Sequence, residues 1–261
     1  MFEFHKNKEV YFSHQTLNSE RYIIPFVEAK RALFKGMRVL EIGCAEGGVL
    51  KPFLDRGCVA VGVELDQSRC EYFKQFLAKE IANKQAMVIN RDIYKIDVNA
   101  DLGGKFDLII LKDVIEHIHD QEKLLKELQS FLNPKGVIYF GFPPWQMPFG
   151  GHQQVCRSKF ISRFPYIHLL PFGIYEWLLK VFNENVEMYT EIKETGISIE
   201  RFERIVESAG YNTIHKIHYL LNPIYTFKFN LRPLKQNFIV RNIPYFRNYV
   251  TTCVYYLIES K

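Results

Sequence analysis

Short apolar runs alternate with amphipathic stretches between residues 37 and 142. The runs are only four to six residues long and rich in β-branched side chains, which is typical of strands. The run at 106–111 is nearly continuous, as expected for a strand that is buried on both faces of a sheet. The stretches between the runs repeat apolar positions every three to four residues, which indicates helices. We expect strands at 37–42, 59–63, 86–89, 106–111 and 137–142, and helices at 47–56, 67–83 and 120–132.

The regular alternation ends after residue 142. Residues 143–188 are rich in proline, glycine and aromatic side chains, and residues 223–248 are irregular, aromatic and basic. Between them lie an expected helix at 199–209, closed by Gly210, and an expected strand at 211–219. A last strand is expected at 249–258. The aromatic residues of the first irregular stretch include Trp145, Phe149, Phe160, Phe164, Tyr166, Phe172, Tyr175 and Trp177.

Strands that alternate with helices predict an α/β domain with a mostly parallel sheet. We expect this domain to cover residues 36–261, with seven strands of which the last is antiparallel, after a helical lead-in at 1–35. The segments at about 143–190 and 223–248 are expected to be insertions that form a helical, aromatic cap. Most of the aromatic side chains in the cap are expected to form its core, and a pocket lining or a dimer contact are the alternatives.

The composition is that of an ordinary globular protein: 48% of the 261 residues are hydrophobic, 24% are charged, and the net charge is +5. Acidic and basic residues interleave almost everywhere, so no basic stripe for nucleic acid is evident. The five cysteines are scattered and form no CxxC pair, which favours reduced thiols over a disulfide framework.

Nothing in the chain predicts export or a membrane span. The first ten residues are polar and charged, unlike a signal peptide. The best apolar stretch, 167–182, is interrupted by Pro171, Gly173, Glu176 and Lys180. We therefore expect a cytoplasmic protein with no integral membrane segment and no nucleic-acid partner, and a homodimer stays open.

The strongest chemical signal is at residues 39–48, Val-Leu-Glu-Ile-Gly-Cys-Ala-Glu-Gly-Gly, where a strand enters a turn of small residues. Gly43 and Gly47 allow positive φ and a close approach of the backbone to a ligand. Glu41 is an unusual residue near the end of a buried strand. It suits a cationic or hydroxyl-rich ligand, such as the ammonium group of an amino-acid moiety. The alternative is a solvated glutamate at an ordinary turn.

Two more acids follow neighbouring strands. Glu64 ends the second strand, where a carboxylate can accept hydrogen bonds from both hydroxyls of a ribose. Its alternative role, the N-cap of the next helix, is better filled by Asp66. After the third strand, Asp92 can accept from an adenine amino group while Ile93 packs on the ring. Taken alone, Asp92 would be an ordinary loop acid.

Residues 41–47, Glu-Ile-Gly-Cys-Ala-Glu-Gly, resemble the E/D-x-G-x-G-x-G motif of class I S-adenosylmethionine-dependent methyltransferases. The resemblance covers about residues 36–142. It implies a Rossmann-like mixed sheet, S-adenosyl-L-methionine as cofactor, contacts of Glu41 and Gly43 with its methionine part, and contacts of Glu64 with its ribose. Ala45 replaces the usual middle glycine, which alanine tolerates if its φ stays negative. The expected cofactor-binding residues are Glu41, Gly43, Cys44, Ala45, Gly47, Glu64, Leu65, Asp92, Ile93, Lys112 and Asp113.

Two other functions compete with methyl transfer: a nicotinamide-dependent oxidoreductase and a catalytically inactive cofactor-binding protein. The spacing of Gly43, Ala45 and Gly48, followed by Glu64, imitates a dinucleotide-binding fingerprint. However, Glu41 would place a carboxylate beside the pyrophosphate, which is electrostatically unfavourable. No Tyr-x-x-x-Lys pair for hydride transfer is evident either.

Residues 112–117, Lys-Asp-Val-Ile-Glu-His, follow the fourth strand at the edge of the sheet where ligands bind. On a helical turn, Asp113, Glu116 and His117 would share one face. His117 is our first candidate for an acid–base group. The alternative is that Glu116 and His117 only order the loop.

The same segment resembles the D/E-x-x-E-H segment of quinone-type O-methyltransferases and small-RNA 2′-O-methyltransferases, where it can bind a divalent cation. Two carboxylates and one imidazole could hold Mg²⁺, Mn²⁺ or Zn²⁺. We nevertheless predict no metal, because many relatives with this segment need none and the first ligand here is the shorter Asp113.

Residues 143–153, Pro-Pro-Trp-Gln-Met-Pro-Phe-Gly-Gly-His-Gln, predict a bent, adjustable lid. The lid resembles the Gly-x-His segment of type-11-like small-molecule methyltransferases and could bring His152 over an acceptor. A loop histidine without a role is the alternative. His168, His215 and His218 are assigned no function. We thus expect methyl transfer to a small-molecule oxygen, with nitrogen or carbon as alternatives, and His117 and His152 as catalytic candidates.

Overall fold

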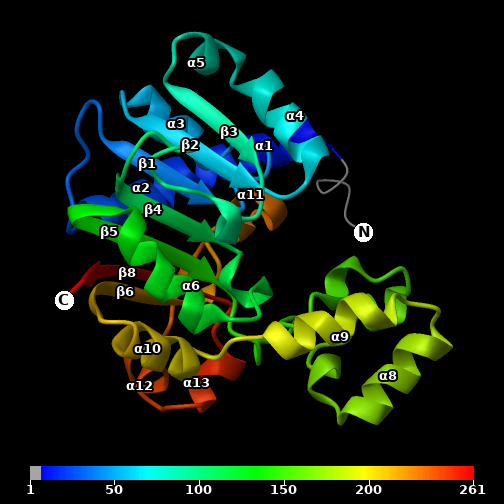
Figure 1. The fold of residues 1–261 in the computed structure, drawn as a ribbon. Coiled ribbons are helices and arrows are strands. Elements are labelled where there is room, and N and C mark those ends of the chain that lie inside the picture. Colours follow the sequence, from blue (N-terminus) through cyan, green and yellow to red (C-terminus); the bar gives the residue numbers. More distant parts are fainter. Residues whose placement is uncertain (1–6) are drawn as a thin grey trace.

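The computed structural model describes residues 7–261, which fold around one eight-stranded sheet (Figure 1). The strand order is β3-β2-β1-β4-β5-β8-β6-β7. The strands are β1 (Arg38–Ile42), β2 (Val59–Glu64), β3 (Ala86–Asn90), β4 (Phe106–Lys112), β5 (Leu132–Phe142), β6 (Tyr211–Leu221), β7 (Leu234–Lys235) and β8 (Cys253–Ser260).

The first five strands are parallel to one another, and β8 lies antiparallel between β5 and β6. The predicted Rossmann-like α/β fold and its antiparallel last strand are therefore confirmed, but the sheet has eight strands instead of seven. The eighth strand, β7, is a two-residue edge paired with β6. It was not predicted, because two residues are too few to show an alternating pattern.

Helices cover both faces of the sheet (Figure 1). Side chains of α6 and α10 join the apolar cluster on one face. Residues 23–27, together with side chains of α3 and α4, join the cluster on the other face. The helices of the sheet domain outside the insertions are α1 (Lys8–Asn18), α2 (Ile24–Glu28), α3 (Lys51–Asp55), α4 (Gln67–Phe76), α5 (Ala78–Ala82), α6 (Gln121–Leu128) and α10 (Ile199–Ser208).

The central strands β1, β4 and β8 are buried on both faces over most of their length, which explains their nearly continuous apolar pattern. Along β1, Leu40 and Ile42 enter the cluster under α6 and α10, while Val39 enters the cluster on the opposite face. Phe202 of α10 is fully buried among three aromatic rings of β5 and β8. Burial of one such side chain contributes about 1.5–3 kcal/mol to folding. The sheet is thus a rigid platform for its carboxyl edge.

Helices α7 (Lys159–Arg163), α8 (Phe172–Val181) and α9 (Val186–Thr195) form a cap with its own small core, which projects from the sheet body (Figure 1). The expectation that most cap aromatics are core residues is wrong. Five of the eight are exposed. Phe172 and Trp177 lie on the face of α8 that does not pack on the cap core, and Phe160 and Phe164 pack on each other at the surface of the cap. The exposed residues are Phe160, Phe164, Tyr166, Phe172 and Trp177.

The last insertion contains α11 (Tyr225–Phe229), which packs on α1. It also contains α12 (Phe238–Arg241) and α13 (Phe246–Tyr249), which lie below α10 at the end of the sheet near β6 (Figure 1). Within residues 7–261, no helix is long and apolar enough to cross a membrane. All five cysteines are buried and free, which agrees with the expected absence of a disulfide framework.

Candidate functional site

The turn after β1 lies at the carboxyl edge of the sheet, between β2 and β4, which flank β1 on either side. Gly43 and Gly47 have φ values of +69° and +84°, which glycine adopts without strain. Both also lack space for a side chain. A Cβ on Gly43 would lie 2.5 Å from Val114, and one on Gly47 would lie 2.6 Å from Phe73. The glycines are therefore required by conformation and by packing.

Ala45 occupies the middle position of this turn with a φ of +47°. The condition under which alanine is tolerated at this position, a negative φ, is therefore not met. A left-handed conformation costs an alanine about 1–2 kcal/mol. Its backbone N–H donates a hydrogen bond of 2.9 Å to Oε2 of Glu64, which offsets part of this cost. The carboxylate at the end of β2 therefore helps to hold the strained turn in place.

Glu41 of β1 is 2% exposed, and its Oε2 atom has no hydrogen-bond partner among the described residues. Burial raises the pKa of this carboxyl well above its usual range, and the nearby Lys112 charge opposes this only in part. An unsatisfied buried carboxyl oxygen costs about 1–3 kcal/mol, or more if it is charged. The site is thus incomplete until a donor, such as an ammonium group, reaches Glu41.

A small pocket with about 20 Å³ of free space, enough for a water molecule, opens beside Glu41. Among the predicted cofactor residues, Gly47, Glu64, Leu65, Asp92 and Ile93 do not line it. The residues that line it are Tyr11, Gln15, Glu41, Gly43, Cys44, Ala45, Glu46, Gly48, Val49, Lys112 and Asp113.

Helix α1 contributes two pocket residues, Tyr11 and Gln15, that the sequence did not indicate as functional. A Cβ on Gly48 would lie 2.6 Å from the Phe12 carbonyl oxygen, so α1 packs directly on the turn. Lys8 also donates a hydrogen bond of 2.6 Å to the buried Glu46. These contacts join residues more than 30 positions apart, and no local motif marks them. The lead-in helix is therefore a wall of the cofactor pocket.

Glu64 lies at the end of β2, where its Oε1 accepts hydrogen bonds from the N–H groups of Leu65 (2.9 Å) and Asp66 (3.0 Å). Each carboxylate oxygen has about two acceptor positions, and Oε2 accepts from only one donor, the Ala45 N–H, among the described residues, so one position is left for a ligand. Asp66 accepts from the N–H groups of Ser68 and Arg69 at the start of α4. The predicted assignment of the N-cap to Asp66 is confirmed.

Asp92 accepts a hydrogen bond of 3.1 Å from the Tyr94 N–H through Oδ1. Its Oδ2 atom accepts no hydrogen bond from the described residues. Ile93 is 8% exposed and packs in the sheet core, whereas Leu65 is 72% exposed. Leu65 therefore offers a larger apolar surface to an adenine ring than Ile93 does.

The segment after β4 differs from the expected helical turn. Asp113 has a φ of +55°, and its N–H donates to the Gly141 carbonyl oxygen at 2.7 Å. This breaks the helical progression, so only a three-residue 3₁₀ turn, Ile115–His117, follows. Asp113 pairs with Lys112 at 2.5 Å instead of sharing a face with Glu116 and His117. Although desolvation opposes it, the Lys112 ammonium lowers the pKa of Asp113.

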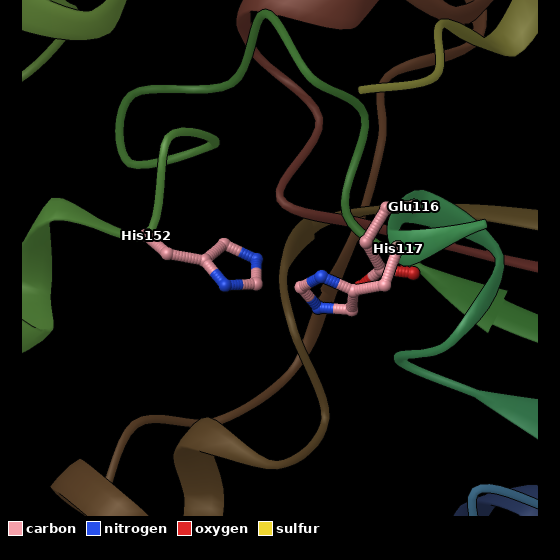
Figure 2. A group of neighbouring side chains, drawn as sticks. All are labelled: Glu116, His117 and His152. Carbon is pink, nitrogen blue, oxygen red and sulfur yellow. The ribbon is translucent and has the colours of Figure 1, made fainter. Parts of the chain in front are cut away.

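His152 of the lid lies beside Glu116 and His117, where the sequence predicted Asp113. One potential ligand atom each from Glu116, His117 and His152 lies within 4.8 Å of the others. The ring centroids of the two histidines are 4.9 Å apart at 76°, and Figure 2 shows the rings turned toward each other. His152 has a φ of +55°, a conformation in which histidine is enriched. The two predicted catalytic residues therefore meet in space, although 35 positions separate them.

Desolvation sets the protonation of this cluster. It lowers the pKa of His152 to about 4, with the neighbouring His117 as second cause, and it also lowers the pKa of His117. Both imidazoles are therefore neutral near pH 7 and able to accept a proton. Desolvation and the Asp113 charge raise the pKa of the buried Glu116 well above its usual range. Neither of its carboxyl oxygens has a hydrogen-bond partner among residues 7–261.

Among residues 7–261, Glu116, His117 and His152 form a cluster that could hold a metal ion. Two imidazoles and one carboxylate suit Zn²⁺ or a similar first-row ion better than Mg²⁺. The absence of a resident metal stays a prediction.

The lid, residues 143–153, is held in place by hydrogen bonds and close packing, whereas the sequence predicted an adjustable loop. The Trp145 N–H donates to the Ile197 carbonyl oxygen at 2.9 Å. Nε2 of the buried His168 lies 2.8 Å from the Trp145 carbonyl oxygen. A Cβ on Gly151 would lie 2.3 Å from His168. His168 thus positions the lid, a structural role that the sequence did not indicate.

A family model described as a methyltransferase domain matches residues 16–216, more than half of the chain. The chain belongs to the class I S-adenosylmethionine-dependent methyltransferases. The predicted family is therefore confirmed. Relatives of this methyltransferase include two proteins named ubiquinone biosynthesis O-methyltransferase. The one from Bartonella bacilliformis is 25% identical over 131 residues, which are 48% of this chain and 51% of the relative. The one from Coxiella burnetii is 26% identical over 117 residues, 45% and 47% of the two chains.

This methyltransferase thus matches only about half the length of these relatives. Solved structures share its fold over nearly the whole chain. The plantazolicin methyltransferase has a TM-score of 0.56 at 13% identity and covers 99% of this chain and 87% of its own. Magnesium protoporphyrin IX methyltransferase from Synechocystis has a TM-score of 0.56 at 12% identity and covers 100% and 89%. At such low identity the likeness concerns the fold alone.

Proposed function

We propose that this methyltransferase binds S-adenosyl-L-methionine across the turn after β1 and methylates an oxygen atom of a small-molecule acceptor. The observation that carries the proposal is the buried, unpartnered oxygen of Glu41, which faces a pocket at the end of β1. A carboxyl in this position is costly without a donor. The ammonium group of the methionine part of the cofactor supplies one.

The residues present fit the other end of the cofactor as well. Glu64 keeps a free acceptor position at the neighbouring strand end, where ribose hydroxyls can donate to it. Hydrogen bonds to charged groups contribute about 1.5–3 kcal/mol each. The small, positive-φ turn at Gly43 lets the backbone approach between the two carboxylates. Leu65 and Asp92 complete the proposed adenine side.

When bound, the cofactor supplies a methyl group with an electron-poor carbon and a neutral thioether as leaving group. The chain contributes orientation of the acceptor, which can supply up to about 7–11 kcal/mol in favourable systems. It also contributes a base. His117 or His152 would take the proton of the acceptor hydroxyl as it attacks the methyl carbon. Two neutral imidazoles at this edge support this role.

The choice of oxygen is supported by the two relatives, whose names describe them as O-methyltransferases. The interleaved charges of most of the chain support a small-molecule acceptor rather than a nucleic acid. The five free, buried cysteines support a cytoplasmic location. Self-association of the chain stays an open question.

The direct test incubates the purified chain with methyl-labelled S-adenosylmethionine and a panel of phenols, catechols and aliphatic alcohols, with matched amines as the control acceptors. We expect label in an ether of at least one hydroxyl acceptor. Transfer to amines alone would contradict the choice of oxygen. Tight binding of NAD without binding of S-adenosylmethionine would contradict the proposal as a whole and favour the oxidoreductase alternative.

A further inference from the structure

One part of the chain departs from its otherwise mixed charge pattern. Residues 208–258 contain no aspartate or glutamate, although an even spread of the 29 acids would place about six there. The same residues carry six cations, which are Lys216, Lys228, Arg232, Lys235, Arg241 and Arg247. This region is therefore the basic part of a chain with a net charge of only +5.

Three of these cations are free to act at the surface. Lys216 and Arg247 are neutralised by Glu203, and Arg247 also by Glu200. In contrast, Arg232, Lys235 and Arg241 are exposed and take part in no ion pair among residues 7–261.

Exposed apolar side chains surround the three free cations. Two of them, Phe238 and Ile239 of α12, are 68% and 69% exposed. Single exposed apolar residues are normal on a protein surface. Eight of them lie within residues 231–249, which we call the docking segment, and such a concentration indicates an interaction site. The eight are Leu231, Leu234, Phe238, Ile239, Ile243, Tyr245, Phe246 and Tyr249.

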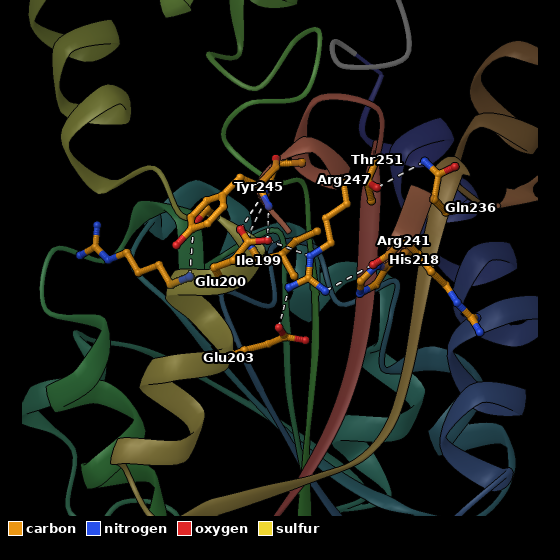
Figure 3. Close-up of polar contacts among 12 residues, drawn as sticks. Ile199, Glu200, Glu203, His218, Gln236, Arg241, Tyr245, Arg247 and Thr251 are labelled. Atoms are coloured by element: carbon orange, nitrogen blue, oxygen red, sulfur yellow. Dashed lines mark hydrogen bonds and ion pairs between the residues drawn. The ribbon is translucent and has the colours of Figure 1, made fainter. Parts of the chain in front are cut away.

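The docking segment is anchored by its polar groups, as Figure 3 shows. The Tyr245 N–H donates to Glu200 at 2.8 Å, and Asn248 donates to the same carboxylate at 2.6 Å. The buried Arg247 donates to Glu200 at 2.8 Å and to Glu203 at 2.6 Å. Gln236 donates to the Val250 carbonyl oxygen at 2.7 Å. Polar groups thus bind inward while apolar side chains face outward, the reverse of an ordinary aqueous surface.

We propose that the docking segment binds the surface of a bilayer that contains anionic lipids. Apolar side chains on a surface helix enter the boundary between headgroups and acyl chains to about 5–10 Å. Lys and Arg beside them contact anionic headgroups, and Tyr is favoured at this depth. The free Arg232, Lys235 and Arg241 supply the matching charge. The segment lies on the membrane and does not span it.

The chemistry of the segment favours lipid over other partners. Ile239, Ile243 and Leu234 are aliphatic and exposed, and they offer nothing to the phosphates or bases of a nucleic acid. In a symmetric contact between two copies, the same three free cations would face each other without an acid in the segment to pair with them.

The docking segment follows α11, which packs on α1, the helix that contributes Tyr11 and Gln15 to the pocket beside Glu41. At its other end, the Tyr166 hydroxyl of the cap donates to the Tyr249 carbonyl oxygen at 3.0 Å. The inference itself does not depend on methyl transfer.

The test is flotation of the full chain with vesicles of phosphatidylcholine alone or with added phosphatidylglycerol. We expect binding to the anionic vesicles that weakens with salt. The double variant Phe238→Ser with Ile239→Ser should lower the partition coefficient at least tenfold, and Lys235→Glu with Arg241→Glu should do the same. Phe34→Ser is the matched control, because Phe34 is 55% exposed and outside the segment. It should bind like the wild type.

Thermal unfolding of each variant separates lost binding from lost folding. Unchanged vesicle binding by both folded double variants would overturn the proposal, as would equal binding of the wild type to neutral and anionic vesicles. Light scattering that shows a dimer disrupted by the Phe238 and Ile239 changes would assign the surface to a second copy instead. Since vesicle binding needs no cofactor, its failure is distinguishable from a failure of the proposed function.

Discussion

Glu41 should lose a proton when the cofactor binds. In the free protein, burial raises the pKa of its carboxyl well above the usual range, so the neutral form is favoured. An ammonium group beside the unpartnered oxygen favours the charged form and lowers the pKa. Binding near or below the raised pKa therefore releases up to about one proton per ligand.

The sign and size of the pH dependence follow from this linkage. Below the raised pKa of the free protein, the Kd for S-adenosylhomocysteine should fall about tenfold for each unit of rising pH, which is about 1.4 kcal/mol. Above that pKa, Glu41 is already charged and the dependence should vanish. The Lys112 charge opposes the rise of the pKa and so narrows the pH range of the effect.

Isothermal titration in two buffers with different ionisation enthalpies measures the released protons directly. Glu41→Gln is the matched variant, because its amide has nearly the same shape but cannot ionise. We expect the variant to bind at least tenfold more weakly and to release no proton from this position. Methylthioadenosine, which lacks the amino-acid part, should bind the wild type without proton release. Tight binding with no released proton at any pH would refute the assigned role of Glu41.

Three further results are expected. Glu64→Ala should weaken S-adenosylhomocysteine binding at least tenfold in the same titration, about 1.4 kcal/mol, and unchanged affinity would mean that the ribose lies elsewhere. His117→Ala and His152→Ala should each lower kcat more than cofactor affinity. If His152 is the base, its pKa of about 4 predicts a kcat that is flat near neutral pH and falls only as the pH drops toward 4; a limb near 6.5 would argue against it. Activity should survive dialysis against a chelator, whereas a loss that Zn²⁺ or Mn²⁺ restores would assign a metal to the cluster around Glu116.

The sheet could be predicted because each long strand carries its own local signal. The strand at 106–111 is buried on both faces, so its apolar run is visible without knowledge of its neighbours. The turn at Gly43 was visible for the same reason, since positive φ and close packing both require glycine. The left-handed conformation of Ala45 could not be predicted, because it is supported by a carboxylate 19 positions away.

The errors at the site arise where tertiary contacts override local spacing. Asp113 had helical spacing to Glu116, but a hydrogen bond to the Gly141 carbonyl oxygen of the next strand turns the chain away. His152 was assigned to a mobile lid, and only the fold shows that it meets His117. Tyr11 of α1 reaches the pocket from a segment without a motif. Such contacts depend on the whole fold and leave no pattern in a short window of sequence.

The decisive measurement is a crystal structure of the chain grown with S-adenosylhomocysteine. The account predicts the ligand amino nitrogen within hydrogen-bond distance of the Glu41 carboxyl and the ribose hydroxyls on Glu64, with α1 closed over the turn. A ligand bound elsewhere with Glu41 still unpartnered, or a pyrophosphate of a dinucleotide lying across the turn, would contradict it.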